Sequence, residues 1–167
     1  VPNKASFYRA NALYDAGLID EALDAYLKLD LQFKNKVEDL NTFALLRNEY
    51  GLNAKSAGDS EGAKYFFRSV LAVDGVSGFN KQSAMHNLAM VYKKDSLYNE
   101  AITFLDSAVS IQGATPVQYY ISLMDKGELL LLQGKNKEAV ATLEQAAKMQ
   151  VDVSHDLRLM KVYYFLE

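Results

Sequence analysis

The amino-acid sequence predicts an all-α protein, an array of helical hairpins, and one recurring pattern carries this prediction. Four alanines each have a small residue twelve positions earlier, a turn residue five positions earlier and a large apolar residue four positions later. The alanines are Ala22, Ala63, Ala101 and Ala139; the small residues are Ala10, Gly51, Ala89 and Gly127; the turn residues are Gly17, Gly58, Ser96 and Gly134; the large residues are Tyr26, Phe67, Leu105 and Leu143. This recurrence indicates units of two helices that fold back on each other, with small residues where the helices touch.

Each unit supplies two amphipathic segments that we expect to be helical. In chain order, the expected helices span 3–16, 19–33, 35–57, 60–73, 80–94, 97–111, 116–133 and 136–149. Asp59 and Thr115 are suitable N-cap residues, and Pro116 fits the first position of a helix. A ninth helix is expected from about Ser154 to the end of the sequence.

The third unit fits a known pattern best, because Leu88, Ala89 and Tyr92 are followed by Ala101 and Leu105. With this spacing the chain resembles the tetratricopeptide repeat family. The resemblance implies a right-handed α-solenoid of about four hairpins plus a terminal helix, in a single domain over 1–167. The expected repeats are about 3–36, 44–77, 82–115 and 120–153, with a truncated or capping helix over 154–167.

The spacing of the alanines departs from the family pattern. They are 41, 38 and 38 residues apart, whereas the family repeat is about 34 residues long. Because an α-helix has about 3.6 residues per turn, the additional residues amount to one or two turns. We therefore expect longer helices with the same stacking. We also expect the chain to be part of a longer protein, because it starts without methionine and stops inside an apolar segment.

Composition excludes several classes of function. Without cysteine there are no disulfides, thiolate metal sites or cysteine nucleophiles. A net charge of −3 gives no electrostatic footprint for nucleic acid or an anionic membrane. Neither His86 nor His155 is followed by a second histidine or a carboxylate at i+3 or i+4, and no phosphate loop or nucleophile motif occurs. We expect no catalytic residue, no metal and no cofactor. The sequence does not distinguish a cytoplasmic from a bacterial periplasmic location.

The resemblance implies a scaffold for protein–protein interaction, with a concave groove lined by the first helix of each repeat. Three positions of each first helix are expected to line this groove. By register they carry Phe7, Tyr8, Asn11, Asn48, Glu49, Leu52, His86, Asn87, Met90, Met124, Asp125 and Glu128. Amides, aromatics, methionines and acids together suit an extended peptide or a helix from a protein partner. The alternative is that these side chains only solvate a groove that binds nothing.

Two further expectations concern the partner. Phe7 stands where family members that bind a carboxylate carry lysine, and Asp125 and Glu128 are acidic, so a neutral or basic partner is favoured over an acidic tail. The terminal helix could pair with a second copy of the chain through its apolar residues. A different function class also stays open, a sensory or regulatory input domain of a larger bacterial signalling protein, such as a receptor kinase or a transcription regulator.

Overall fold

The computed structural model describes residues 4–16, 18, 21, 25, 28, 29, 40–113 and 115–149. The chain divides into two compact units, Val1–Phe43 and Ala44–Glu167. These described residues form seven α-helices and no β-strand. Helix α1 (Lys4–Asp15) lies in the first unit. Of the expected helix over 19–33 the structure describes residues 21, 25, 28 and 29, which are helical, and the expected helix from Ser154 onward falls outside the described residues.

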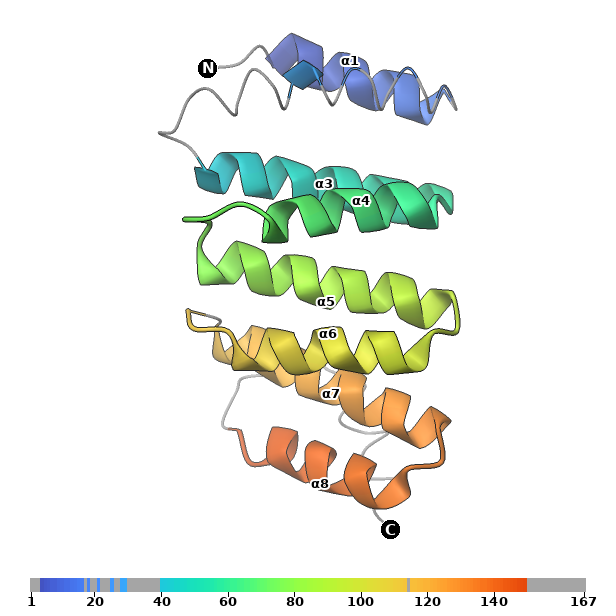
Figure 1. Ribbon diagram of the computed structural model, residues 1–167, viewed down its shortest axis with the longest axis vertical. Helices are drawn as coiled ribbons and strands as arrows, with labels where there is room; N and C mark the ends of the chain where they lie inside the picture. Colours follow the sequence, from blue (N-terminus) through green and yellow to red (C-terminus); the bar gives the residue numbers. More distant parts are fainter. Residues whose placement is uncertain are drawn as a thin grey trace. The chain divides into compact units, whose positions relative to one another are not determined.

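The other helices succeed one another through the second unit (Figure 1). They are α3 (Leu40–Ala57), α4 (Ser60–Leu71), α5 (Gly78–Lys94), α6 (Tyr98–Ser110), α7 (Pro116–Leu132) and α8 (Asn136–Ala147). Neighbouring helices along the chain pack on each other from α4 to α8, and α5 also contacts α7. The second unit is therefore an α-solenoid of helical hairpins, as the sequence predicts.

Where the structure describes the residue at an expected helix end, the observed end in most cases differs from it by no more than two residues. Asp59 caps α4, since its carboxylate accepts a hydrogen bond from the Gly62 backbone N–H at 2.8 Å. Thr115 caps α7 in a capping box with Gln118, as a threonine three residues before glutamine allows. Helix α5 begins at Gly78, two residues earlier than expected, because Ser77 serves as its N-cap.

Within the second and fourth hairpins, the small residue of the first helix meets the large residue of the second. A Cβ atom on Gly51 would come within 2.4 Å of the Phe67 ring, and one on Gly127 within 2.3 Å of Leu143. In the third hairpin Ala89 and Leu105 hold these places, and both are fully buried. The small and large residues that the sequence pattern singled out are therefore the contact points of the hairpins, and the expected register is confirmed.

The turn inside each hairpin requires a residue with positive φ. Gly58, Ser96 and Gly134 have φ values of 85°, 62° and 72°, respectively. In the last of these turns the Lys135 N–H donates to the Leu130 carbonyl at 2.9 Å, and the other two turns repeat that bond. This is the Schellman arrangement, in which a left-handed residue ends the helix. Ser96 takes this conformation without the freedom that glycine has.

A polar cluster joins α4 to the end of α5. The Lys64 amine lies 2.9 Å from Glu61 and 2.8 Å from Asp95, and Ser60 Oγ donates to Asp95 at 2.9 Å. These partners raise the pKa of Lys64 and lower the pKa of Asp95, in each case chiefly through the hydrogen bond between the two. The amine also lies 5.1 Å from the centre of the Tyr92 ring. The contact of this hairpin with the next is thus partly electrostatic.

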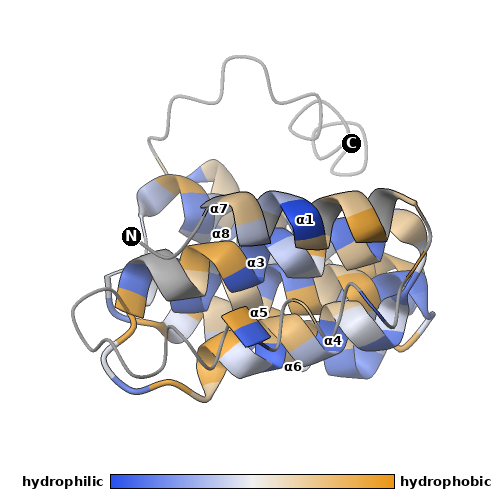
Figure 2. Ribbon diagram, turned by 90° about the horizontal axis from the view of Figure 1, so that it is seen from above, coloured by the Kyte–Doolittle hydropathy of each residue, from blue (hydrophilic) through white to orange (hydrophobic). Residues whose placement is uncertain are grey.

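The helices carry hydrophobic and hydrophilic residues side by side rather than long apolar runs (Figure 2). No helix among the described residues has the length and apolar character needed to cross a membrane.

Candidate functional site

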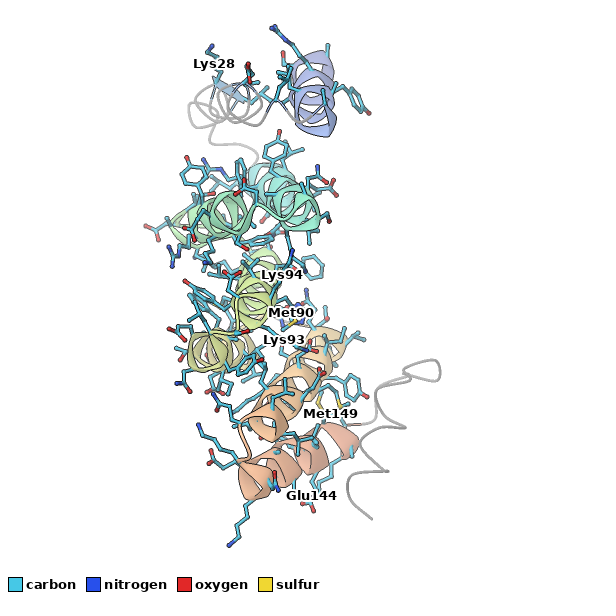
Figure 3. The ribbon with its side chains drawn as sticks, turned by 90° about the vertical axis from the view of Figure 1, so that its right-hand side faces the viewer. Lys28, Met90, Lys93, Lys94, Glu144 and Met149 are labelled. Carbon is cyan, nitrogen blue, oxygen red and sulfur yellow. The ribbon has the colours of Figure 1, made fainter. Side chains whose placement is uncertain are left out.

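The first helices of the second unit, α3, α5 and α7, form one layer, and Figure 3 shows α3 and α5 on one side with α4 and α6 on the other. We call the exposed side of α3, α5 and α7 the first-helix face. Of the positions that the sequence predicts for the groove in repeats two to four, Glu49, Leu52, His86, Asn87, Met90 and Glu128 are at least partly exposed. Side-chain hydrogen bonds join α3 to α5 and α5 to α7, so this face is held together by polar contacts.

Buried amides make the first of these contacts. Asn48 on α3 donates its side-chain N–H to the Asn80 carbonyl on α5 at 3.2 Å. Gln82 on α5 donates to the Ser122 hydroxyl at 2.9 Å and to the Gln118 carbonyl at 3.1 Å. Gln82 and Ser122 are almost completely buried. Because a buried amide without a partner is costly, these bonds fix the spacing of the three helices.

A histidine–carboxylate hydrogen bond and an ion pair continue the row toward the C-terminal ends of α5 and α7. The His86 Nε2 atom lies 2.7 Å from Asp125 Oδ2, and the Lys93 amine lies 2.8 Å from Glu128 Oε2. Asp125 is 5% exposed. Both acids of the predicted fourth-repeat lining are therefore engaged by neighbouring side chains of the protein. The expectation that these acids favour a neutral or basic partner stays a prediction.

A pocket opens on the first-helix face between α5 and α7. Its volume is about 170 Å³. It is lined by Gln82, Ser83, His86, Asn87, Gln118 and Ile121. The Gln118 side chain also donates to the Ser83 hydroxyl at 2.9 Å, across the pocket wall. The lining thus offers amide, hydroxyl and imidazole groups, with one aliphatic side chain.

The predicted groove residues fall into three groups in the structure. Glu49 and Leu52 are exposed on α3, and His86, Asn87 and Met90 are partly exposed on α5. Asn48, Met124 and Asp125 are buried, and Met124 packs in the core with Tyr120 and Leu143. In the first unit Tyr8 is 63% exposed, while the side chains of Phe7 and Asn11 lie outside the described part of the chain. Glu128 is exposed and bound to Lys93.

Sequence reasoning missed Gln82, Ser83 and Gln118. Gln82 and Ser83 precede the predicted groove positions of their helix by about one turn, and Gln118 precedes those of its helix by six residues. Their polar character near the start of a helix was the available signal. The sequence also left the contact between His86 and Asp125 unpredicted, because it joins residues in different repeats.

Lys55, in the last turn of α3, is a further residue that sequence reasoning did not identify. It is half-buried, and this burial lowers the pKa of its amine. The Asp125 charge raises the pKa of Lys55, whereas the Lys94 charge lowers it, as burial does. The charges of Lys55, Asp125 and Lys94 therefore lie near one another. No ion pair or hydrogen bond among the described residues includes the Lys55 side chain.

Within the described residues, no group of three or more histidine and acidic side chains could hold a metal ion.

Comparisons with known proteins agree with this architecture. Residues 82–114 and 120–150 each match a model of the tetratricopeptide repeat. A crystal structure of nearly identical TPR-like repeats, assigned to a putative kinesin light chain of Podosopora anserina, is 16% identical with a TM-score of 0.64, over 98% of this chain and 86% of that chain. A variant of the same protein is 17% identical with a TM-score of 0.66, over 98% and 82% of the two chains. No curated protein shows significant sequence similarity to the chain.

Proposed function

Since this chain belongs to the tetratricopeptide repeat family, a family of non-catalytic scaffolds for protein interaction, we propose that it binds a segment of another protein on its first-helix face. The proposal includes a single domain of four repeats, over about 3–36, 44–77, 82–115 and 120–153. The repeats over 82–115 and 120–153 would supply the central contacts.

The observation that carries the proposal is the pocket between α5 and α7. At about 170 Å³, it is smaller than the roughly 300–1,000 Å³ of a site for a drug-sized molecule. It has room for one amino-acid side chain. Its amide and hydroxyl groups can bond the backbone of an extended segment or a polar side chain, whereas Ile121 offers apolar contact. A polypeptide therefore fits this pocket better than a metabolite does.

Exposed apolar residues beside the pocket support the same conclusion. Phe79 is 48% and Val117 46% exposed. They hold equivalent places at the start of α5 and α7, since 38 residues separate them, as they separate Ala63 from Ala101. Large apolar side chains that recur at an exposed register position are available for contact with a partner. The proposed segment would bury both of them while it places a side chain in the pocket.

A peptide library displayed on phage provides the test. Peptides selected on the wild-type protein should bind Asn87→Ala at least about tenfold more weakly, because Asn87 lines the pocket and a bond to a charged or well-ordered group contributes about 1.5 kcal/mol. Glu144→Ala is the matched control, since Glu144 is an exposed residue of α8, away from the pocket lining. Equal binding to wild type and Asn87→Ala would contradict the proposed site.

The alternative function, an input domain of a signalling protein, depends on sequence outside these 167 residues. None of the described contacts favours it.

A further inference from the structure

The hydrogen bond between His86 and Asp125 determines which nitrogen of the histidine ring carries a proton. The His86 Nε2 atom lies 2.7 Å from Asp125 Oδ2. An aspartate carboxylate is ionised at neutral pH and only accepts hydrogen bonds. Nε2 therefore donates, and it keeps its proton whether the ring is neutral or charged. In the neutral ring the other nitrogen, Nδ1, is then an acceptor without a proton.

The Nδ1 atom of His86 is available to a bound group. It has no hydrogen-bond partner among the described residues, and it is not buried. His86 lines the pocket between α5 and α7. A group seated in this pocket thus meets a hydrogen-bond acceptor, and the buried Asp125 determines that it is an acceptor.

Two glutamines of the pocket lining are already engaged by the protein. The Gln82 side-chain N–H groups donate to the Ser122 hydroxyl and to the Gln118 carbonyl. The Gln118 side chain donates to Ser83 Oγ at 2.9 Å. The Ser83 hydroxyl itself donates to no acceptor among the described residues. The lining therefore keeps one O–H group that a ligand can use.

Asn87 supplies a second free group, because the contact between His86 and Asp125 is not repeated at the preceding junction. A step of one repeat, 38 residues, leads from these two residues back to Asn48 and Asn87. The Asn48 side chain donates to the Asn80 carbonyl instead. The Asn87 amide is thus left without a hydrogen bond to any described residue. It offers both a donor and an acceptor to the pocket that it lines.

We propose that this pocket recognises a glutamine or asparagine side chain of the bound protein segment. The N–H group of that primary amide donates to His86 Nδ1, and its carbonyl oxygen accepts from the Ser83 hydroxyl or the Asn87 amide. The methylene groups of the side chain contact Ile121, an aliphatic residue of the lining. This inference rests on the proposed function, and it names the side chain that the pocket takes.

Other side chains match these groups less well. A carboxylate only accepts, so it would oppose the unprotonated Nδ1 of His86 with no proton between them. A lysine or arginine would lose hydration, and the described lining holds no carboxylate to replace it. An apolar side chain would leave the free groups of His86, Ser83 and Asn87 without partners. A neutral amide, which both donates and accepts, satisfies all three.

The proton on the ring links this preference to pH. The charged groups that act on the ring come from α3, α5 and α7, and they are Glu49, Lys55, Lys93, Lys94, Asp125 and Glu128. Asp125 is bonded to the ring, while Lys93 and Glu128 pair with each other. The described ion pairs of α4 and α6 include no residue of the lining. When the ring takes up a second proton at low pH, Nδ1 changes from an acceptor into a donor.

NMR of the free protein provides the first measurement. Nitrogen chemical shifts of the His86 ring at a pH of about 8.5 should show a proton on Nε2 and none on Nδ1. The second proton, which histidine rings in general take up near a pH of about 6.5, should be added at Nδ1. The loss of signals in His86→Gln assigns them to this ring. A neutral wild-type ring with its proton on Nδ1 would overturn the proposal.

Peptide selection provides the second measurement. Peptides selected on the wild-type protein at a pH of about 8.5 should carry Gln or Asn at one fixed position. Replacement of that residue by Glu or Met should weaken binding about tenfold, which corresponds to about 1.4 kcal/mol. At a pH of about 5.5 the loss for Glu should fall below about threefold, because the protonated ring donates, whereas the loss for Met should stay. A fixed acidic, basic or apolar residue at the higher pH would overturn the amide assignment.

His86→Phe tests whether the imidazole is the group responsible. The variant keeps a flat ring without nitrogen atoms, so it should bind the selected peptides about tenfold more weakly. The loss on replacement of the amide by Glu should then be the same at both pH values. Glu144→Ala, on α8 and away from the lining, should behave as wild type. A pH dependence that persists in His86→Phe would contradict the role of this ring.

The two proposals fail in different ways. Peptides that depend on Asn87 but show no preference for an amide side chain would overturn the amide assignment and leave the proposed function intact. Peptides that ignore Asn87, or the enrichment of no peptide at all, would contradict both.

Discussion

Gly127 and Leu143 compete for the same space across the fourth hairpin. A Cβ atom on Gly127 would lie 2.3 Å from the Leu143 Cδ2 atom, well inside van der Waals contact. Leu143 is buried, so its side chain cannot move into solvent. Glycine is required at position 127 because the Leu143 side chain leaves no room for a Cβ atom, and not because of its backbone conformation.

Gly127→Ala is therefore expected to destabilise the protein although alanine favours helix. The gain in helix propensity is about 1 kcal/mol, and overpacking costs about 1–3 kcal/mol, so the net loss should reach about 2 kcal/mol. In a Leu143→Ala background the space is open, and the same substitution should become stabilising. Urea unfolding of the four proteins in this cycle measures the effect. A loss of equal size in both backgrounds would show that the two residues do not share the space.

Ser96→Gly is expected to stabilise the protein. Ser96 has φ of 62° where the equivalent turns carry glycine, and the left-handed conformation costs an L-residue about 1–2 kcal/mol. About 0.4–1 kcal/mol of this stabilisation is offset, because glycine gives the unfolded chain more conformational freedom. The free energy of unfolding should therefore rise by about 0.5–1 kcal/mol in total. Thermal unfolding should show a rise of about 1–4 °C. Gly134→Ser is the reciprocal control, and a rise in its melting temperature would contradict this account.

The bond between Lys64 and Asp95 should make stability depend on pH at both ends of the scale. The pKa of Asp95 is lowered from its ordinary value of 3.8, so its contribution is complete above that pH and is lost as pH falls through the folded-state value. The pKa of Lys64 is raised from 10.5, so its contribution is complete below that pH and is lost as pH rises through the folded-state value.

Asp95→Asn is consequently expected to lower the free energy of unfolding by about 1 kcal/mol at pH 7. The difference from wild type should shrink as pH falls from 3.8 through the lowered folded-state pKa of Asp95, where the wild-type carboxyl also becomes neutral. Chemical unfolding at pH 7 and at low pH gives the comparison, with Asp74→Asn at an exposed position between α4 and α5 as a control. A difference that stays the same at both pH values would assign the effect to shape rather than charge.

Ala101→Trp should unfold the third hairpin, because Ala101 is completely buried where α5 and α6 meet. Overpacking of this size exceeds the about 1–3 kcal/mol of an ordinary methylene insertion. Glu100→Trp adds the same ring at the neighbouring exposed position and should leave cooperative melting unchanged. Circular dichroism with temperature compares the two, and a wild-type transition in Ala101→Trp would refute the register.

The hairpins could be predicted from the sequence because their contacts depend on local spacing. Gly51 and Phe67 meet across one turn, so a fixed separation along the chain brings them together. The first-helix face could be predicted only in part. His86 reaches Asp125 in the next repeat, 39 positions away, and such a contact depends on how successive hairpins stack. Asn48 and Met124, which the family resemblance placed in the groove, are buried, Asn48 against α5 and Met124 against Leu143 of its own hairpin.

The contacts between α3, α5 and α7 also bear on how this chain can change over evolution. Asn48 meets the Asn80 backbone at one junction, while His86 and Lys93 use Asp125 and Glu128 at the next. Each junction thus has its own residue pairs, and neither can be exchanged for the other. Loss or exchange of the repeat that carries α7 would leave His86 and Lys93 without Asp125 and Glu128, so the last two repeats depend on each other's side chains.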